Sequence, residues 1–259
     1  MSLADEYRQQ SRWRDWPRLF AALPDCAGRR VYDLGCAIGD QSAELAARGA
    51  RVIGIDSNAE LLAAARARNV PCAEYIAADL RALPGDLPAA DGIWCSFATA
   101  YFVDLTPVLS AWSQFLAPGG WIALTEIDDL FAHEPLGAAT WALLDGYVAE
   151  SLRTRRYDFK MGSKLADSLT AAGFSVEHAC EVADREFAFR GPAEPDVVDA
   201  WRRRFERMPV LRAFCGADAA RVRDEFLACL AHPDHRSLGS VRFCLATTGG
   251  SREARHGGR

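Results

Sequence analysis

The sequence lacks long hydrophobic runs, paired cysteines and an excess of positive charge. No apolar stretch approaches the ~20 residues that a membrane-spanning helix needs. The first ten residues carry Asp5, Glu6 and Arg8 where a secretory signal would be apolar. The eight cysteines form no C-x-x-C pair and lie in apolar contexts, as reduced, buried thiols do. We therefore expect a cytoplasmic protein that does not bind a membrane.

The charge and composition of the chain further restrict the classes of protein to which it can belong. The formal net charge is −5, which argues against a general nucleic-acid binder because phosphate recognition needs a basic face. Half of the 259 residues are hydrophobic, enough for a core that encloses a small-molecule site. Only residues 249–259, GGSREARHGGR, have the low complexity that predicts a disordered tail.

Residues 30–126 show the pattern of a parallel α/β sheet, with short apolar runs alternating with amphipathic segments. Strands are predicted at residues 31–34, 51–56, 74–78, 92–97 and 121–126. Helices are predicted at residues 41–48, 59–68 and 106–116, the first two capped by Asp40 and Asn58.

The regular alternation stops after residue 126. Two segments, 127–162 and 184–239, are interpreted as insertions that together form a helical cap. Residues 163–183 return to the core with a helix and a strand, and residues 240–248 supply the last core strand. Residues 1–29 precede the sheet as a helix rich in aromatic and arginine side chains, and we interpret them as a lid. The arginines of RRRFER (202–207) are predicted to form a solvated helix face, with Trp201 and Phe205 on its buried side.

The candidate ligand-binding residues lie where the first three predicted strands end. DLGCAIGD (33–40) follows the first strand, so its backbone N–H groups and a helix N-terminus meet at one point where glycine permits close approach of a ligand. Asp56 ends the second strand, where a carboxylate can accept hydrogen bonds from ribose hydroxyls. Asp79 follows the third strand. Taken alone, the glycines could be ordinary turn residues and Asp56 a helix cap.

Together these motifs resemble those of the class I S-adenosylmethionine-dependent methyltransferases, in particular the small-molecule branch that contains ubiquinone-biosynthesis enzymes. Asp33, Gly35 and Gly39 match the family's first motif, with Ala37 at a position that is often glycine. Asp56 and Asp79 match its acidic residues after the second and third strands. FLAPGGWIALTE (115–126) and AAGF (171–174) match the entries to the fifth and sixth strands. A nicotinamide dehydrogenase is disfavoured because its G-x-G-x-x-G motif needs glycine at position 37.

The resemblance implies a Rossmann-like, doubly wound sheet of seven mostly parallel strands with a helical cap. It implies S-adenosylmethionine as methyl donor and S-adenosylhomocysteine as product. The residues expected to bind the donor are Asp33, Gly35, Cys36, Ala37, Gly39, Asp56, Ser57, Asp79, Leu80 and Ser96, with Tyr7 and Arg12 from the lid.

Methyl transfer from a sulfonium is an in-line SN2 displacement, so the protein mainly aligns donor and acceptor in a water-poor pocket. A base is needed only where the acceptor must lose a proton. His133 is the first choice because the pKa of histidine suits proton transfer near neutrality, and Tyr101 is a second catalytic candidate. His133 could also be an ordinary loop histidine.

The sequence favours a small-molecule acceptor, methylated on O or N. CSFATAYF (95–102) lacks the Asn/Asp-Pro-Pro-aromatic motif of nucleic-acid amino methyltransferases. The basic residues are 28 arginines and 2 lysines, which is typical of GC-rich bacteria and fits a secondary metabolite. No metal site is predicted, because Cys229, His232 and His235 lack a fourth ligand. A non-catalytic donor-binding sensor and a protein or RNA methyltransferase stay open as alternatives, as do the monomer and the homodimer.

Overall fold

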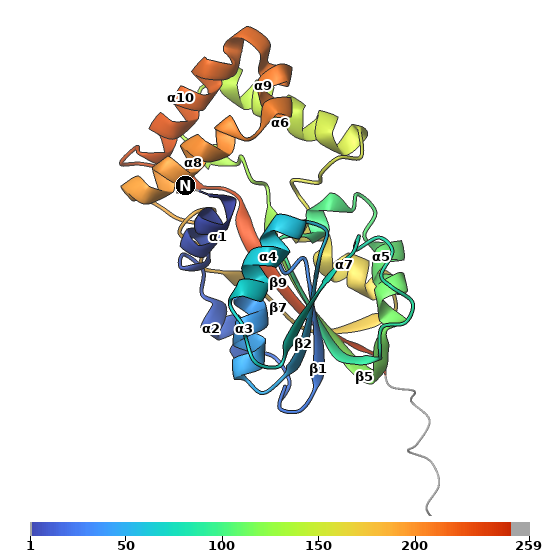
Figure 1. Ribbon diagram of the computed structural model, residues 1–259. Coiled ribbons are helices and arrows are strands. Elements are labelled where there is room, and N and C mark those ends of the chain that lie inside the picture. Colours follow the sequence, from blue (N-terminus) through green and yellow to red (C-terminus); the bar gives the residue numbers. More distant parts are fainter. Residues whose placement is uncertain (1, 250–259) are drawn as a thin grey trace, which may run out of the picture.

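The computed structural model describes residues 2–249, and a seven-stranded sheet forms their centre (Figure 1). The strand order is β3-β2-β1-β4-β5-β9-β7. Of these, β9 runs antiparallel to both of its neighbours and the others run parallel to one another. The strands are β1 (Arg30–Leu34), β2 (Arg51–Asp56), β3 (Ala73–Ala77), β4 (Ala90–Ser96), β5 (Leu116–Asp128), β7 (Phe174–Val182) and β9 (Ser240–Thr248). This arrangement confirms the predicted seven-stranded, mostly parallel sheet.

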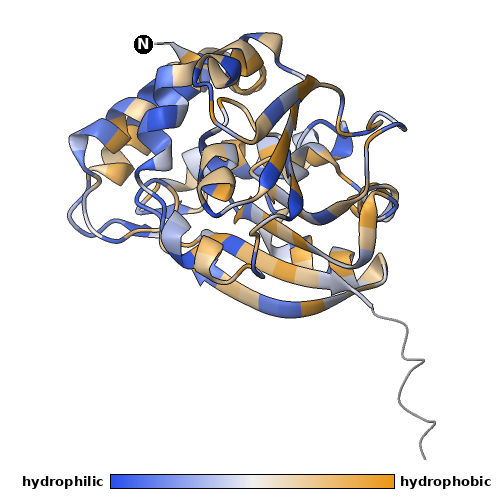
Figure 2. Cartoon of the chain, turned by 60° about the horizontal axis from the view of Figure 1, so that its bottom comes forward, coloured by the Kyte–Doolittle hydropathy of each residue, from blue (hydrophilic) through white to orange (hydrophobic). Residues whose placement is uncertain are grey.

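Helices cover both faces of the sheet because its central strands are buried on both sides, as apolar parallel strands require. On one face, Val31 and Val52 share a core with Leu45 and Phe20 of α3 (Asp40–Ala47) and α2 (Trp16–Ala21). The adjacent residues of the same strands point to the other face. There they pack against α5 (Thr106–Ser113) and α7 (Leu165–Ala171). In Figure 2 the helices mix hydrophilic and hydrophobic residues, as expected of elements with one buried side.

One of the two predicted helix caps is correct. Asn58 caps α4 (Ala59–Ala67) by accepting hydrogen bonds from the backbone N–H groups of Glu60 and Leu61. Asp40, in contrast, is the first residue of α3 rather than its cap. Gly39 occupies the cap position without a side-chain hydrogen bond, and the Asp40 carboxylate pairs with Arg68 instead.

The inserted segments form a helical layer beyond the carboxyl ends of the strands (Figure 1). It contains α6 (Ala138–Arg153), α8 (Pro195–Glu206), α9 (Pro209–Cys215) and α10 (Ala219–Leu230). A ladder of two short strands, β6 (His133–Glu134) and β8 (Arg236–Ser237), joins the first insertion to the second. The helix α1 (Leu3–Ser11) lies between this cap and the sheet. Short 3-10 turns complete the structure at η1 (Thr99–Tyr101), η2 (Gly162–Lys164) and η3 (Gly216–Asp218).

None of the helices within residues 2–249 has both the length and the hydrophobicity that crossing a bilayer requires. Apart from Gly249, the predicted disordered tail (249–259) lies outside the described part of the chain.

Candidate functional site

A cavity of about 750 Å³ lies over the carboxyl ends of β1, β2 and β4. Its volume is within the roughly 300–1,000 Å³ of small-molecule sites in proteins. The floor comes from the loops that follow the first four strands, and the roof from α1 and the cap. Of the predicted site residues, those that line the cavity are Tyr7, Gly35, Cys36, Ala37, Asp56, Ser57, Asp79, Leu80, Ser96 and Tyr101.

The loop after β1 takes an unusual path that brings its backbone to the cavity floor. Gly35, Ala37 and Gly39 all have left-handed backbone conformations, with φ of +77°, +46° and +73°. A Cβ atom on Gly35 would lie 2.7 Å from the Cβ of Ala98 in the loop after β4. Glycine is therefore required at position 35 both by its dihedral angle and by its close neighbour.

Asp56 connects this loop to the end of β2. Its Oδ2 accepts a hydrogen bond of 3.0 Å from the backbone N–H of Ala37, and its Oδ1 accepts one of 2.8 Å from that of Asn58. The first of these bonds supports the left-handed conformation of Ala37. Because each carboxylate oxygen has two acceptor sites, both oxygens can still accept from a ligand hydroxyl. The arrangement can therefore hold a diol at the cavity floor.

Three residues predicted to bind the donor do not line the cavity. Asp33 is buried below the loop and accepts a 2.5 Å hydrogen bond from Ser42 Oγ, and burial raises the pKa of its carboxyl to about 7. Gly39 packs toward the hydroxyl of Tyr75. Arg12 ends α1 and is exposed, whereas the lining arginine of this segment is Arg14. Asp33 and Gly39 thus shape the loop from outside the cavity.

Tyrosines surround the upper half of the cavity. Tyr7 comes from α1, Tyr101 from η1, and Tyr157 from the segment after α6. The rings of Tyr101 and Tyr157 meet edge to face, with centroids 5.0 Å apart. Burial raises the pKa of all three hydroxyls above the ordinary tyrosine value, so they are neutral hydrogen-bond donors near pH 7.

Glu126 fixes the position of η1, which carries Tyr101. The side chain is fully buried at the end of β5 and accepts hydrogen bonds of 3.0 Å from Thr99 Oγ1, Ala100 N and Ile127 N. Burial raises the pKa of its carboxyl to about 7. Because the carboxyl is enclosed by these donors, it does not face the cavity and acts as a structural anchor for the loop.

The position of His133 argues against its predicted role as a base. Only 1% of the residue is exposed, and it is not among the residues that line the cavity. Its Nδ1 lies 3.0 Å from Nε2 of His235, and the two rings stack within a cluster that includes Trp201 and Phe226. Burial lowers the pKa of His133 to about 3. A ring enclosed in this way has no access to an acceptor, so His133 contributes to the core of the cap.

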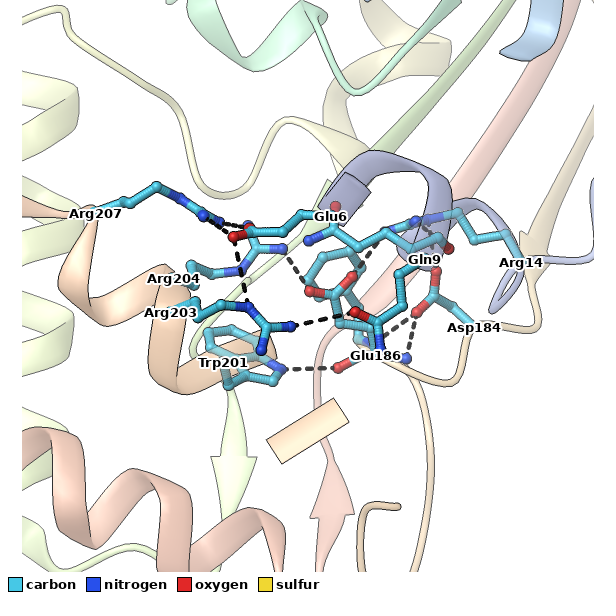
Figure 3. Close-up of polar contacts among 11 residues, drawn as sticks. Glu6, Gln9, Arg14, Asp184, Glu186, Trp201, Arg203, Arg204 and Arg207 are labelled. Atoms are coloured by element: carbon cyan, nitrogen blue, oxygen red, sulfur yellow. Dashed lines mark hydrogen bonds and ion pairs between the residues drawn. The ribbon is translucent and has the colours of Figure 1, made fainter. Parts of the chain in front are cut away.

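The sequence interpretation missed a buried polar network that joins α1 to α8 (Figure 3). Glu186 is fully buried and pairs with both Arg14 and Arg204. Glu6 of α1 pairs with Arg203 and Arg207. Arg204 lines the cavity, so the prediction that its segment presents only a solvated face is wrong. In the sequence, this network was indicated only by the high density of arginines in the segments of α1 and α8. Their acidic partner Glu186 comes from a separate loop.

Within residues 2–249, no group of three or more His, Cys, Asp and Glu side chains is placed to hold a metal ion. His235, part of the weak Cys-His-His pattern, pairs with His133 instead.

Comparisons with known proteins show the family of this chain. Residues 31–120 match a family described as a methyltransferase domain. A trans-aconitate 2-methyltransferase of Methylobacterium nodulans is 32% identical over 189 residues, covering 68% of this chain and 67% of that protein. Another, from Deinococcus radiodurans, is 34% identical over 124 residues, covering 46% of this chain. In that match the chain spans about half of the relative's length, 47%, as it does in two further trans-aconitate relatives.

Solved structures share the fold. The crystal structure of an S-adenosylmethionine-dependent methyltransferase from Mesorhizobium loti superposes with a TM-score of 0.54 at 23% identity, covering 90% of this chain and 97% of that one.

Proposed function

Because this chain belongs to the class I S-adenosylmethionine-dependent methyltransferase family, we propose that it transfers the donor's methyl group to a small molecule bound in the cavity above β1, β2 and β4. The observation that carries the proposal is the convergence of the Asp56 carboxylate and the glycine-dependent loop after β1 on the floor of one cavity, which α1 and the cap cover in part.

The residues of the cavity floor fit S-adenosylmethionine. Asp56 has free acceptor sites for the two ribose hydroxyls. Gly35 keeps the backbone of the loop free of side chains where the ligand would approach it. The exposed carboxylate of Asp79 lines the wall after β3, where the adenine amine would find an acceptor. Cys36, Ala37, Ser57, Leu80 and Ser96 complete the donor-binding set we propose.

S-Adenosylmethionine supplies an electrophilic methyl group, so the chemical work of the chain is to position the acceptor and exclude water. Tyr7 of α1 and Tyr101 of η1 lie on the cavity wall and can donate hydrogen bonds to the acceptor. The helix α1 is held against the cap by the ion pairs of Glu6 with Arg203 and Arg207. We infer that α1 shields the bound pair of ligands from solvent.

A small-molecule acceptor suits the size of the cavity. The helix α1, which the ion pairs of Glu6 hold against the cap, narrows the access of a polymer to the floor. The trans-aconitate methyltransferases among the relatives act, by their names, on a small molecule. Donor binding without turnover and methylation of a protein or RNA are the competing functions that the following experiments address.

Calorimetric titration with S-adenosylhomocysteine tests the donor site. We expect Asp56→Ala to weaken binding by about 10- to 100-fold, the equivalent of losing charge-assisted hydrogen bonds worth about 1.5–3 kcal/mol. Asp86→Ala is the matched control, because Asp86 is an exposed acid that does not line the cavity. An unchanged affinity in Asp56→Ala would contradict the assignment. Transfer of a deuterated methyl group to a mixed panel of acids, phenols and amines then separates an enzyme from a donor-binding sensor.

A further inference from the structure

The 3-10 turn η1 contacts two of the loops that form the cavity floor. Just before the turn, Ala98 lies so close to Gly35 of the loop after β1 that a Cβ added to the glycine would lie 2.7 Å from the Cβ of Ala98. The backbone oxygen of Tyr101 accepts a hydrogen bond of 3.1 Å from Arg81 of the loop after β3. All four residues line the cavity. The position of η1 is therefore tied to the loops after β1 and β3.

The same turn contacts the first insertion. The backbone oxygen of Ala100 accepts a hydrogen bond of 2.8 Å from the backbone N–H of Asp158, in the segment after α6. Next to this bond, the rings of Tyr101 and Tyr157 meet edge to face. Both tyrosines line the cavity, so a displacement of η1 would move this part of the wall relative to the floor.

Glu126, near the end of β5, holds η1 through three hydrogen bonds. Its Oε2 accepts from Thr99 Oγ1 and from the backbone N–H of Ala100, and its Oε1 accepts from the backbone N–H of Ile127, each at 3.0 Å. A backbone N–H can only donate, so both oxygens of the side chain must be acceptors. A carboxylate meets this requirement, whereas the amide of a glutamine would present its own N–H groups to one of the two backbone donors.

The charge of Glu126 has no partner of opposite sign in the part of the chain that the structure describes. Arg242, which faces Glu126 in register from β9, pairs with Glu181 instead, and the nearby Asp158 and Lys164 pair with each other. The other titratable groups near Glu126 are neutral near pH 7, because burial raises their pKa values; they are Cys95 of β4, Tyr101 and Tyr157. Burial likewise raises the pKa of Glu126 to about 7, so this group changes charge close to neutral pH.

From these contacts we propose that Glu126 is a positioning residue for methyl transfer: its carboxylate fixes η1, and thereby Tyr101 and Tyr157, over the floor of the cavity. The inference rests on the proposed methyltransferase function. Glu126 does not line the cavity, so it acts on the reaction only through the turn. Hydrogen bonds to an ionised acceptor are about twice as strong as those to a neutral one, so protonation of the carboxylate weakens all three bonds. The turn is therefore held most firmly above a pH of about 7.

Hydrogen exchange of the Ala100 amide, followed by NMR with S-adenosylhomocysteine bound, tests the hold on η1 without a methyl acceptor. After correction for the intrinsic exchange rate, protection in the wild type should be about five- to tenfold higher at pH 8 than at pH 6. The reason is that the ionised fraction of a carboxyl with a pKa of about 7 falls from roughly 0.9 to 0.1 between these pH values. In Glu126→Gln the protection should be low and equal at both. Calorimetry should give this variant an affinity for S-adenosylhomocysteine within about threefold of the wild type, because the bonds of Asp56 do not involve η1.

Glu74→Gln is the matched control, because Glu74 is an exposed strand glutamate that does not line the cavity. It should keep the wild-type protection at both pH values. Thr99→Val removes one donor to Glu126 and leaves both backbone bonds, so its protection at pH 8 should be lower than in the wild type while the dependence on pH persists. Equal protection of Ala100 at pH 6 and pH 8 in the wild type overturns the proposal, whether or not Glu126→Gln folds.

The rate of transfer of a deuterated methyl group to the panel of acids, phenols and amines is the second readout. The ratio of the wild-type kcat to that of Glu126→Gln should fall by about five- to tenfold from pH 8 to pH 6, and this ratio cancels any titration of the acceptor itself. A purely structural residue would lower kcat by the same factor at both pH values, which would overturn the positioning role while the proposed function stands. Binding of S-adenosylhomocysteine without transfer to any member of the panel would overturn both.

Discussion

Substitution of Gly35 by alanine tests whether the conformation and packing of the loop after β1 require glycine at this position. The residue has φ of +77°, and an added Cβ would lie 2.7 Å from the Cβ of Ala98. A left-handed conformation costs a residue with a side chain about 1–2 kcal/mol. Carbon atoms prefer separations of about 3.5–4.0 Å, and overpacking of this kind typically costs about 1–3 kcal/mol. We therefore expect the free energy of unfolding to fall by about 2–5 kcal/mol.

Two further variants separate the backbone strain from the steric overlap. Gly28 has φ of +71°, and a Cβ added there would have no heavy atom within 4 Å, so Gly28→Ala should show the strain alone. Adding Ala98→Gly to Gly35→Ala removes the overlap and leaves the strain. A double-mutant cycle of positions 35 and 98 should then give a coupling of about 1–3 kcal/mol.

Urea denaturation followed by tryptophan fluorescence measures these changes. With a slope of about 3 kcal/mol per molar urea, Gly35→Ala should lower the midpoint by about 0.7–1.7 M. Its affinity for S-adenosylhomocysteine should fall as well, because the overlap displaces the cavity floor. Equal midpoints for Gly35→Ala and Gly28→Ala, together with no coupling to position 98, would refute the reasoning.

Three other variants address the network, the histidine pair and the buried acid. Glu186→Gln removes the anion that Arg14 and Arg204 share. We expect the free energy of unfolding to fall by about 3 kcal/mol and hydrogen exchange in α1 to become faster. Asp199→Asn, on the exposed face of α8, is the control and should change neither quantity. His133→Ala should lower the melting temperature, because the ring is buried in the cap. At a temperature where the variant is folded, its rate of methyl transfer should stay within about threefold of the wild-type rate, because the ring lies outside the cavity. A loss of a hundredfold or more, about 2.7 kcal/mol, would instead support a role as base. Because burial raises the pKa of Asp33 to about 7 from an ordinary value of 3.8, the folded state takes up a proton more readily than the unfolded state, and stability falls as pH rises from about 4 to 7. Asp33→Asn should remove this contribution, so its stability relative to the wild type should be higher at pH 8 than at pH 5 in urea titrations; the same difference at both pH values would contradict the shift.

The sheet and the loops that form the cavity floor could be predicted because their signals are local in sequence. A strand, its glycine turn and the following helix are contiguous, so the loop around Gly35 could be recognised from eight residues, 33–40. Asp56 and Asp79 both line the cavity, because parallel strands end at one edge of the sheet.

The cap could not be predicted in the same way because its contacts join distant residues. His133 pairs with His235, 102 positions away, and no local pattern indicates that such a loop histidine is buried. The role of Arg204 depends on Glu186 and on α1, which folds back from the other end of the chain. Arg12 was predicted to bind the donor, but it is exposed just after α1, and Arg14 lines the cavity instead.

The aromatic residues of the insertions can be either pocket walls or the cap's own core, and their sequence pattern does not distinguish the two roles. In the structure some of them serve both purposes. Phe131, Tyr147, Phe159, Trp201 and Phe205 are buried in one hydrophobic cluster, and Tyr147 and Phe159 of this cluster also line the cavity, together with Tyr157. Hydrophobicity alone does not distinguish the two roles, because the residues in both are shielded from bulk solvent by the same helices.

The short ladder of β6 and β8 has a consequence for how acceptor preference can be exchanged between related proteins. It places His133 of the first insertion against His235 of the second, with Glu134 beside Arg236. Grafting either insertion alone onto another sheet would leave a buried imidazole without its partner and an unpaired strand edge. The two insertions, separated by α7 and β7 in the chain, therefore form one transferable module, and recombination that respects this discontinuous unit should yield folded chimaeras where single-segment swaps should fail.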